Sequence, residues 1–191
     1  MDKLKPFEQA PHLAVAVSGG ADSLALTILL ANWVRHVNGT LTALTVDHGL
    51  RDSSDEESKA VAVFVENLGI KHHILKWRGP IPQGGIQSVA RKMRFKLLET
   101  WCRDNSVLHL LLGHHIGDQA ETILMRIARG NHHFSLSAMN PIRETTCIRI
   151  LRPLLDVEKN NLVATLQVRG IQWVQDPFNV DRRFSRVRAR A

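Results

Sequence analysis

Short apolar segments alternate with longer segments of helical periodicity along this chain, and the alternation limits the folds open to it. Runs rich in Val, Leu, Ile or Ala, each closed by turn residues, predict buried strands over residues 12–17, 41–46, 72–75 and 107–112. Amphipathic helices are predicted over residues 22–36, 55–67, 88–103, 118–129 and 156–169. Residues 130–149 are expected to be irregular. We therefore expect a doubly wound α/β fold, with a mostly parallel five-stranded sheet and helices on both faces.

Composition sets the broad class. The 191 residues, 44% of them hydrophobic, are enough for one buried core, which predicts a single domain. A net charge of +7 favours a polyanionic partner such as nucleic acid, with a solvated basic surface as the alternative. Cys102 and Cys147 form neither a C-x-x-C pair nor a disulfide framework, and the amino end lacks a signal-peptide pattern, so a cytoplasmic location is expected. The longest apolar stretch, residues 24–34, is too short for a membrane span.

The first predicted strand runs into the sequence SGGADS, which comprises Ser18, Gly19, Gly20, Ala21, Asp22 and Ser23. Two glycines allow a tight turn that brings backbone N–H groups against an anion, and the helix start that follows also favours negative charge. The stretch is neither a Walker A motif nor G-x-G-x-x-G. Because an acid in an anion cradle would repel phosphate, we hypothesise that Asp22 holds Mg²⁺ on the phosphates. The alternative is a helix N-cap in a tight turn.

Two pairs of charged residues have the i, i+3 spacing that places side chains on one helix face. Asp118 and Glu121 suit an ammonium group or a second Mg²⁺, or else form a solvated acidic helix start. Arg91 and Arg94 can bind phosphate through their planar guanidinium groups, or else lie in solvent. Adjacent histidines such as 114 and 115 diverge in both helices and strands, so no structural zinc site is expected.

Five stretches in order narrow the interpretation: SGGADS, VDHGLR, ARKMRF, GHHIGDQAET, and RPLL with DPFN. Together they resemble the amino-terminal catalytic domain of the tRNA(Ile)-lysidine synthetases, which are PP-loop ATP pyrophosphatases. The resemblance implies a Rossmann-like domain over residues 1–191 that uses ATP and Mg²⁺. It implies adenylation of the C2 oxygen of the wobble cytidine in a tRNA(Ile) with a CAU anticodon, and displacement of AMP by free L-lysine. It further implies that the family's C-terminal tRNA-binding domains are absent from this chain, and it leaves a homodimer open.

The resemblance also assigns residues to roles. The expected ATP-binding residues are Ser18 to Ser23 of SGGADS, with Arg91, Arg94, Val46, His48 and Gly113. Asp118, Glu121 and Arg186 are expected to bind substrate, Arg186 being one of five arginines in the last ten residues. The expected catalytic residues are Asp22, His114, Asp118 and Glu121. The last three of these are candidates for the base that deprotonates lysine, and the choice among them stays open.

Three departures from the family pattern bear on function. Gly117 stands where an acid is usual, residues 129–139 replace a glycine-rich loop, and Phe178 stands where serine is usual. One alternative function is that of a PP-loop enzyme that thiolates tRNA cytidine, although paired cysteines for sulfur transfer are absent. Another is a nucleotide- or RNA-binding domain without catalysis, which the change at Gly117 and the altered loop would favour.

Overall fold

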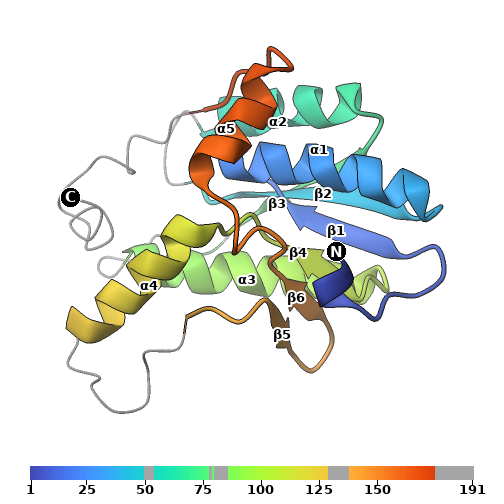
Figure 1. Ribbon diagram of the computed structural model, residues 1–191. Coiled ribbons are helices and arrows are strands. Elements are labelled where there is room, and N and C mark those ends of the chain that lie inside the picture. Colours follow the sequence, from blue (N-terminus) through green and yellow to red (C-terminus); the bar gives the residue numbers. More distant parts are fainter. Residues whose placement is uncertain (50–53, 78, 80–85, 129–137, 175–191) are drawn as a thin grey trace.

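The computed structural model describes residues 1–49, 54–77, 79, 86–128 and 138–174 (Figure 1). Its strands are β1 His12–Ala16, β2 Thr40–Asp47, β3 Lys71–Lys76, β4 His109–Leu111, β5 Ile142–Glu144 and β6 Arg149–Leu151. Its helices are the 3-10 helix η1 Asp2–Leu4 and the α-helices α1 Ala21–His36, α2 Ser54–Asn67, α3 Ile86–Asp104, α4 Ile116–Ala128 and α5 Lys159–Gln167. The described strands form one sheet in the order β3-β2-β1-β4-β6-β5, and β5 alone runs antiparallel to its neighbour.

The doubly wound, mostly parallel sheet is confirmed, but it has six strands where five were expected. The difference arises in the segment predicted to be irregular, where β5 and β6 pair as a short hairpin with Ile142 opposite Leu151. Thr145 closes the turn, because its backbone N–H donates to the Ile148 carbonyl oxygen at 2.9 Å. Each strand has three residues, and β5 lies at the sheet edge with charged, exposed side chains, so no apolar run marks it.

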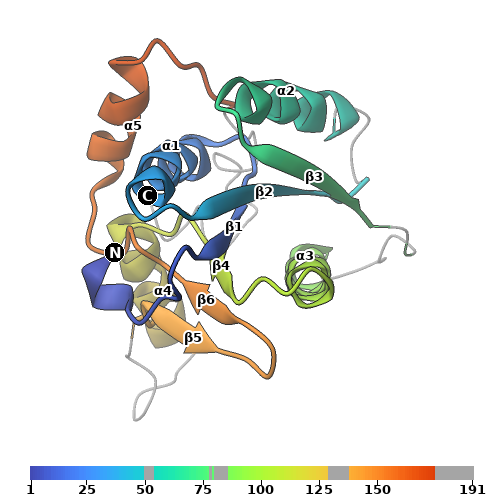
Figure 2. The same cartoon turned by 90° about the vertical axis from the view of Figure 1, so that its right-hand side faces the viewer.

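Helices cover both faces of the sheet, as Figure 2 shows for α1, α2 and α5 on one side and α3 on the other. Leu13 and Val15 of β1 pack in the cluster that contains α1, α2 and α5. Ala14, between them, packs in the cluster that contains Leu98 of α3. Successive side chains of a strand point to opposite faces, so burial on both faces produces the continuous apolar runs that mark these strands in the sequence.

The strand order contains a switch point beside β1. The chain builds β1, β2 and β3 outward in one direction and then returns to add β4 on the other side of β1. Connections leaving β1 and β4 therefore diverge at the carboxyl ends of these strands. In open parallel sheets this divergence leaves a crevice in which ligands bind.

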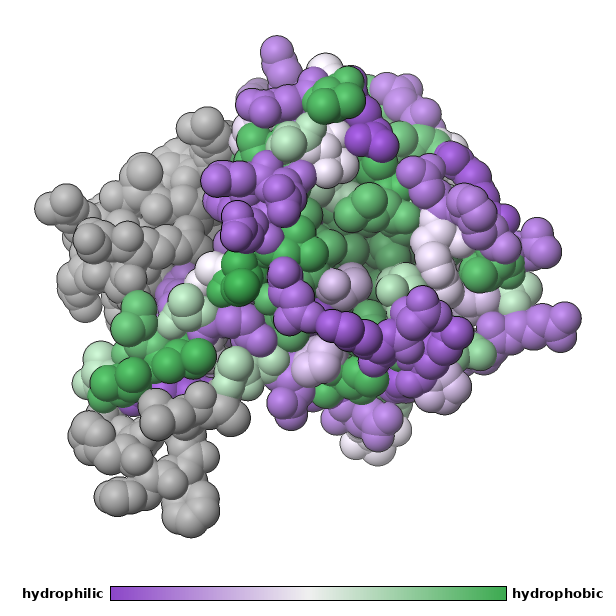
Figure 3. Space-filling model, in the orientation of Figure 1, coloured by the Kyte–Doolittle hydropathy of each residue, from purple (hydrophilic) through white to green (hydrophobic). Residues whose placement is uncertain are grey.

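Helix α4 lies at the periphery, and Glu121 is its one buried residue. Ile116, Leu124 and Ile127 are 46–48% exposed, and apolar side chains gather over this helix in Figure 3. Its first turn is attached to the rest of the fold, because the Ile116 N–H donates to the Val157 carbonyl oxygen at 3.1 Å. Within the described parts of the chain, every helix is too short or too polar to cross a membrane.

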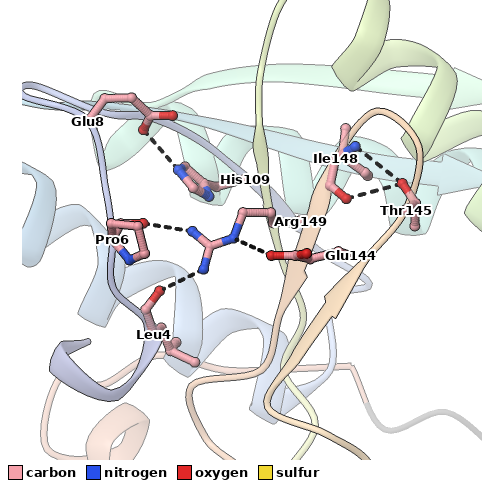
Figure 4. Close-up of polar contacts among 8 residues, drawn as sticks. All are labelled: Leu4, Pro6, Glu8, His109, Glu144, Thr145, Ile148 and Arg149. Carbon is pink, nitrogen blue, oxygen red and sulfur yellow. Dashed lines mark hydrogen bonds and ion pairs between the residues drawn. The ribbon is translucent and has the colours of Figure 1, made fainter.

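A polar cluster holds the amino-terminal segment against the beginnings of strands β4 and β6 (Figure 4). Arg149, the first residue of β6, donates to the carbonyl oxygens of Pro6 at 2.6 Å and Leu4 at 3.2 Å. His109, the first residue of β4, contacts Glu8 through Nε2 at 2.8 Å. Because these residues begin their strands, the cluster lies away from the carboxyl ends and serves the fold rather than the crevice.

Candidate active site

The loops after β1 and β4 are in direct contact at the switch point. A Cβ atom on Gly113 would lie 3.0 Å from the carbonyl oxygen of Asp22 and 3.2 Å from the backbone nitrogen of Ser23. Both neighbours are backbone atoms at the start of α1, so they cannot swing aside. Glycine at position 113 therefore lets the end of β4 lie against the beginning of α1 at the switch point of the sheet.

The loop of residues 18–23 is held in shape by its own hydrogen bonds. Gly19 has φ of +82°, a left-handed conformation that glycine adopts without strain. The Ser23 hydroxyl accepts the Ser18 N–H at 3.2 Å and donates to the Gly20 carbonyl oxygen at 2.9 Å. The proton of the Ser23 hydroxyl is thus used to fix the turn. The exposed Ser18 hydroxyl donates to the Ser23 hydroxyl at 3.3 Å, and the first N–H groups of α1 remain as donors at the loop surface.

Asp22 is in the first turn of α1, with its side chain 28% exposed. One carboxylate oxygen, Oδ1, is buried and has no hydrogen-bond partner among the described residues. The N-cap of α1 is Gly20, whose position has no side-chain capping bond, so Asp22 does not act as the N-cap. A buried carboxylate oxygen without a partner is costly unless a cation or donor completes it. The structure thus favours the cation-binding interpretation of Asp22 over the capping alternative.

His115 lies between two carboxylates, and sequence reasoning did not identify it. Its Nε2 atom is 3.8 Å from Oδ2 of Asp22 and 3.7 Å from Oδ2 of Asp118, and its side chain is 6% exposed. The Gly117 N–H donates to Nδ1 at 3.0 Å, so Nδ1 acts as an acceptor and Nε2 is the ring nitrogen that faces the two acids. The His115 N–H also donates to Asp118 Oδ2 at 3.0 Å. One histidine therefore lies beside both carboxylates and holds Asp118 through its backbone N–H.

The room for this ring comes from Gly117. A Cβ atom at this position would lie 2.7 Å from Cε1 and 3.1 Å from Nδ1 of His115. In the sequence, a glycine two residues after a histidine was the only pattern that could have indicated the role of His115. Its meaning depends on the turn before α4, which the sequence does not reveal.

His114, the adjacent residue, is half-buried and its environment differs from that of His115. Burial lowers the pKa of His114 to about 4, with Arg152, Arg91 and Arg94 adding to the effect and Asp118 opposing it. Its imidazole is therefore neutral at physiological pH. A group with so low a pKa accepts a proton weakly, so His114 is a poor candidate for the base that deprotonates an ammonium group.

The other predicted residues lie around the same crevice. Glu121 is buried one turn after Asp118 on α4, which does not fit a solvated acidic helix start. Arg91 and Arg94 on α3 are half-buried, and their charges lower the pKa of His114 after burial. Burial, followed by the charge of Arg94, also lowers the pKa of His48, beyond the end of β2. The two arginines therefore lie close to the strand ends.

Some predicted residues lie elsewhere. Val46 is within β2 and is half-buried near its carboxyl end. Arg186 and the four other arginines of the last ten residues lie outside the described residues, as do Phe178 and residues 129–137 of the altered loop. Arg152 was not singled out: it is 6% exposed, donates to the Asn140 carbonyl oxygen at 2.7 Å, and adds positive charge beside His114.

A family model described as the PP-loop domain matches residues 1–191. The chain belongs to the PP-loop family. It is similar to the tRNA(Ile)-lysidine synthase of Orientia tsutsugamushi (strain Boryong), at 39% identity over 190 residues, or 100% of this chain and 43% of that protein. It is 44% identical over 187 residues to the enzyme of that name from Bradyrhizobium diazoefficiens, with 97% of this chain and 52% of that protein covered. The chain thus spans about half the length of the curated relatives it matches.

Solved structures share the PP-loop fold at low sequence identity. The U34-tRNA thiolase NcsA from Methanococcus maripaludis with its [4Fe-4S] cluster superposes with a TM-score of 0.79 at 18% identity, covering 96% of this chain and 65% of that one. The NMN synthetase from Francisella tularensis gives a TM-score of 0.51 at 14% identity, with 85% and 63% covered. These likenesses establish the fold.

The PP-loop residues fit a magnesium ion that is held by a single protein carboxylate. Within residues 1–49, 54–77, 86–128 and 138–174, no group of three or more His, Cys, Asp or Glu side chains is arranged as a metal site. Mg²⁺ commonly binds through one or two carboxylates and takes its other ligands from water and substrate phosphates. Asp22, with its unpartnered buried oxygen beside the loop, could supply the carboxylate, whereas a preformed protein cage is absent from the described residues.

Proposed function

We propose that this PP-loop domain catalyses ATP-dependent ligation of L-lysine to C2 of the wobble cytidine in a tRNA(Ile) with a CAU anticodon. ATP would transfer AMP to the C2 oxygen and release pyrophosphate. The lysine ε-amine would then form a bond to C2 as the bond from C2 to the adenylated oxygen breaks, and AMP would leave with that oxygen. The relatives named tRNA(Ile)-lysidine synthase, 39–44% identical over nearly the whole chain, support this assignment.

The observation that carries the proposal is the position of Asp22 and Asp118 on either side of His115. This position puts the loop of residues 18–23 beside Asp118 and Glu121 of α4. A two-step reaction on a single cytidine requires such a shared site. Residues 18–23 would hold the phosphates through backbone N–H groups, and Arg91 and Arg94 would balance their charge. Mg²⁺ on Asp22 would neutralise charge that develops on the phosphates.

The acidic pair would receive the lysine. Asp118 and Glu121 on one face of α4 would bind its ammonium group, and one of them would take the proton that the attacking amine must lose. The low pKa of His114, caused chiefly by burial, leaves that residue as a neutral hydrogen-bonding group near the reacting cytidine. Arg186 is proposed to add positive charge to the substrate side. We further propose that the protein works in the cytoplasm.

The test is an assay of pyrophosphate release and of the mass of the anticodon nucleoside, with ATP, Mg²⁺ and the tRNA, with and without lysine. We expect lysine-dependent conversion of cytidine to lysidine, lost in Asp22→Ala and reduced in Asp118→Ala. Asp2→Ala, which removes an exposed carboxylate beside Lys5 at the amino terminus, is the matched control. ATP binding without either product would contradict the proposal and favour a binding domain.

Thiolation of cytidine is the competing reaction. Cys102 is buried, and this burial raises its thiol pKa to about 12, whereas Cys147 is exposed in the β5–β6 hairpin; both are free. A thiol with so high a pKa is a poor nucleophile and a poor cluster ligand. An iron and sulfide assay of the purified protein tests this reaction, and a positive result would replace lysidine formation with sulfur transfer.

A further inference from the structure

A groove of about 730 Å³ lies between α3 and the β5–β6 hairpin. Its lining includes one acidic residue, Glu99. The cationic lining residues are Arg91, Lys92, Lys96 and Arg103 from α3 and Arg143 from β5. So strong an excess of one sign within a concave surface concentrates positive potential and attracts an anionic partner. Lys92, Lys96, Arg103 and Arg143 are all exposed, and of these Arg103 is paired with the neighbouring Asp104 carboxylate at 2.9 Å.

The cations follow one face of α3. Lys92 and Lys96 are four residues apart, and Arg103 is seven further on, so the three lie along one stripe of the helix. At 1.5 Å per residue, the stripe from Lys92 to Arg103 is about 16.5 Å long. The hydroxyls of Thr100 and Thr146 also line the groove and can donate to phosphate oxygens. A polyanion with regularly spaced charges matches this length better than a small anion does.

One lining residue links the groove to the candidate active site. Arg91 lines the groove, and its charge adds to the burial that lowers the pKa of His114. Arg91 further lies over the ring of Phe95, with Cζ 5.2 Å from the ring centroid, and Phe95 lines the same groove. Arg91 therefore belongs both to the groove and to the surroundings of His114, and a chain of phosphates in the groove would reach the site of chemistry past Arg91.

We propose that this groove binds the phosphate backbone of the substrate RNA on one side of the modified nucleotide. The inference rests on the proposed function for the identity of the polyanion. RNA is favoured over an acidic protein segment because the positive stripe joins a site whose proposed substrate is a nucleotide within RNA. It is favoured over an anionic membrane because the cations line a concavity rather than a flat surface.

Charge reversal tests the proposal directly. We compare the Lys92→Glu/Lys96→Glu double variant with Lys71→Glu/Lys159→Glu, which has the same change of net charge at exposed residues that begin β3 and α5. The probe is a fluorescent anticodon stem-loop with a CAU anticodon, titrated over a range of salt without ATP or lysine. Loss of two phosphate contacts should lower the affinity about 25-fold at 0.1 M salt and the salt slope by about 1.4, whereas the control should bind as wild type.

Cys147 supplies a second measurement that needs no charge change. It lines the groove and is exposed, while Cys102 is buried, so a maleimide reagent should label Cys147 selectively. The stem-loop should slow this labelling at least about tenfold at saturation, and ATP with Mg²⁺ should leave the rate unchanged. Thermal unfolding of each variant checks that the double substitutions leave the fold intact.

The outcomes separate this inference from the proposed function. If both double variants bind the stem-loop as wild type does, or Cys147 stays reactive in the complex, the groove assignment is wrong while lysidine formation can still be observed. Displacement of the stem-loop by poly-glutamate at equal charge concentration would indicate an acidic protein partner and overturn the RNA assignment. Absence of any stem-loop binding at low salt would also overturn it, and the lysidine assay with whole tRNA would then decide the function independently.

Discussion

Replacement of His114 by glutamine should remove a defined part of the protein's acid sensitivity. Burial lowers the pKa of His114 in the folded state to about 4, and the ordinary value in an unfolded chain is about 6.5. Between these values the unfolded chain binds the proton and the folded protein does not. The contribution of His114 to stability is therefore complete above about pH 6.5 and is lost as pH falls toward 4. Acidification from pH 7 to pH 5 should cost about 2 kcal/mol through this residue alone.

Urea unfolding at pH 7 and at pH 5 measures the effect. Burial also lowers the pKa values of His12, His48 and His72, so the wild type should lose more than this amount on acidification. The useful quantity is the difference between wild type and His114→Gln, which should approach about 2 kcal/mol. His36→Gln replaces an exposed histidine and is the matched control. Equal acid sensitivity in His114→Gln and wild type would refute the assignment of His114 as a neutral, half-buried group.

Two further predictions concern the glycines of the crevice. Gly113→Ala should lower the free energy of unfolding by about 1–3 kcal/mol and weaken ATP binding, because its Cβ meets the backbone of Asp22 at 3.0 Å. Gly20→Ala, whose Cβ has no neighbour closer than 3.7 Å, should cost less in the same urea titration, and an equal cost would contradict the contact. Gly117→Ala should also destabilise by about 1–3 kcal/mol, but by much less in a His115→Ala background, since its Cβ meets the His115 ring. Additive costs in that double-mutant cycle would show that the two residues do not interact.

The parts of the fold that the sequence predicted are those in which local pattern and burial agree. The strands over residues 12–17 and 41–46 are buried on both faces and therefore read as unbroken apolar runs. The β5–β6 hairpin was missed because a three-residue edge strand has no such run, and its pairing depends on the position of β4 rather than on its own side chains. The helix boundaries differ by up to three residues from those predicted, a displacement that capping interactions and fraying produce.

The site could be predicted only in part, for a similar reason. Asp22, Gly113 and Asp118 could be predicted as site residues because each lies at the end of a predicted strand or at the start of a predicted helix. His115 could not be chosen over His114, since the two are adjacent and differ only in which way each ring turns before α4. That direction is set by the Gly117 N–H and by the carboxylate of Asp118, both of which act through three-dimensional contacts.

Gly117, which stands where the family usually has an acid, does more than remove a carboxylate from the site. The strand order places residues 113–118 against residues 18–23, and this close approach leaves little room for side chains between them. Because Gly113 has no side chain, its backbone can lie against the backbone of Asp22 and Ser23. Because Gly117 has none, the ring of His115 can occupy the space beside it. A side chain at position 117 would occupy the volume in which the His115 ring now lies beside Asp22 and Asp118. In this chain the missing acid is therefore accompanied by an imidazole between the two remaining carboxylates, and Gly117 and His115 should be varied together in any test of the site.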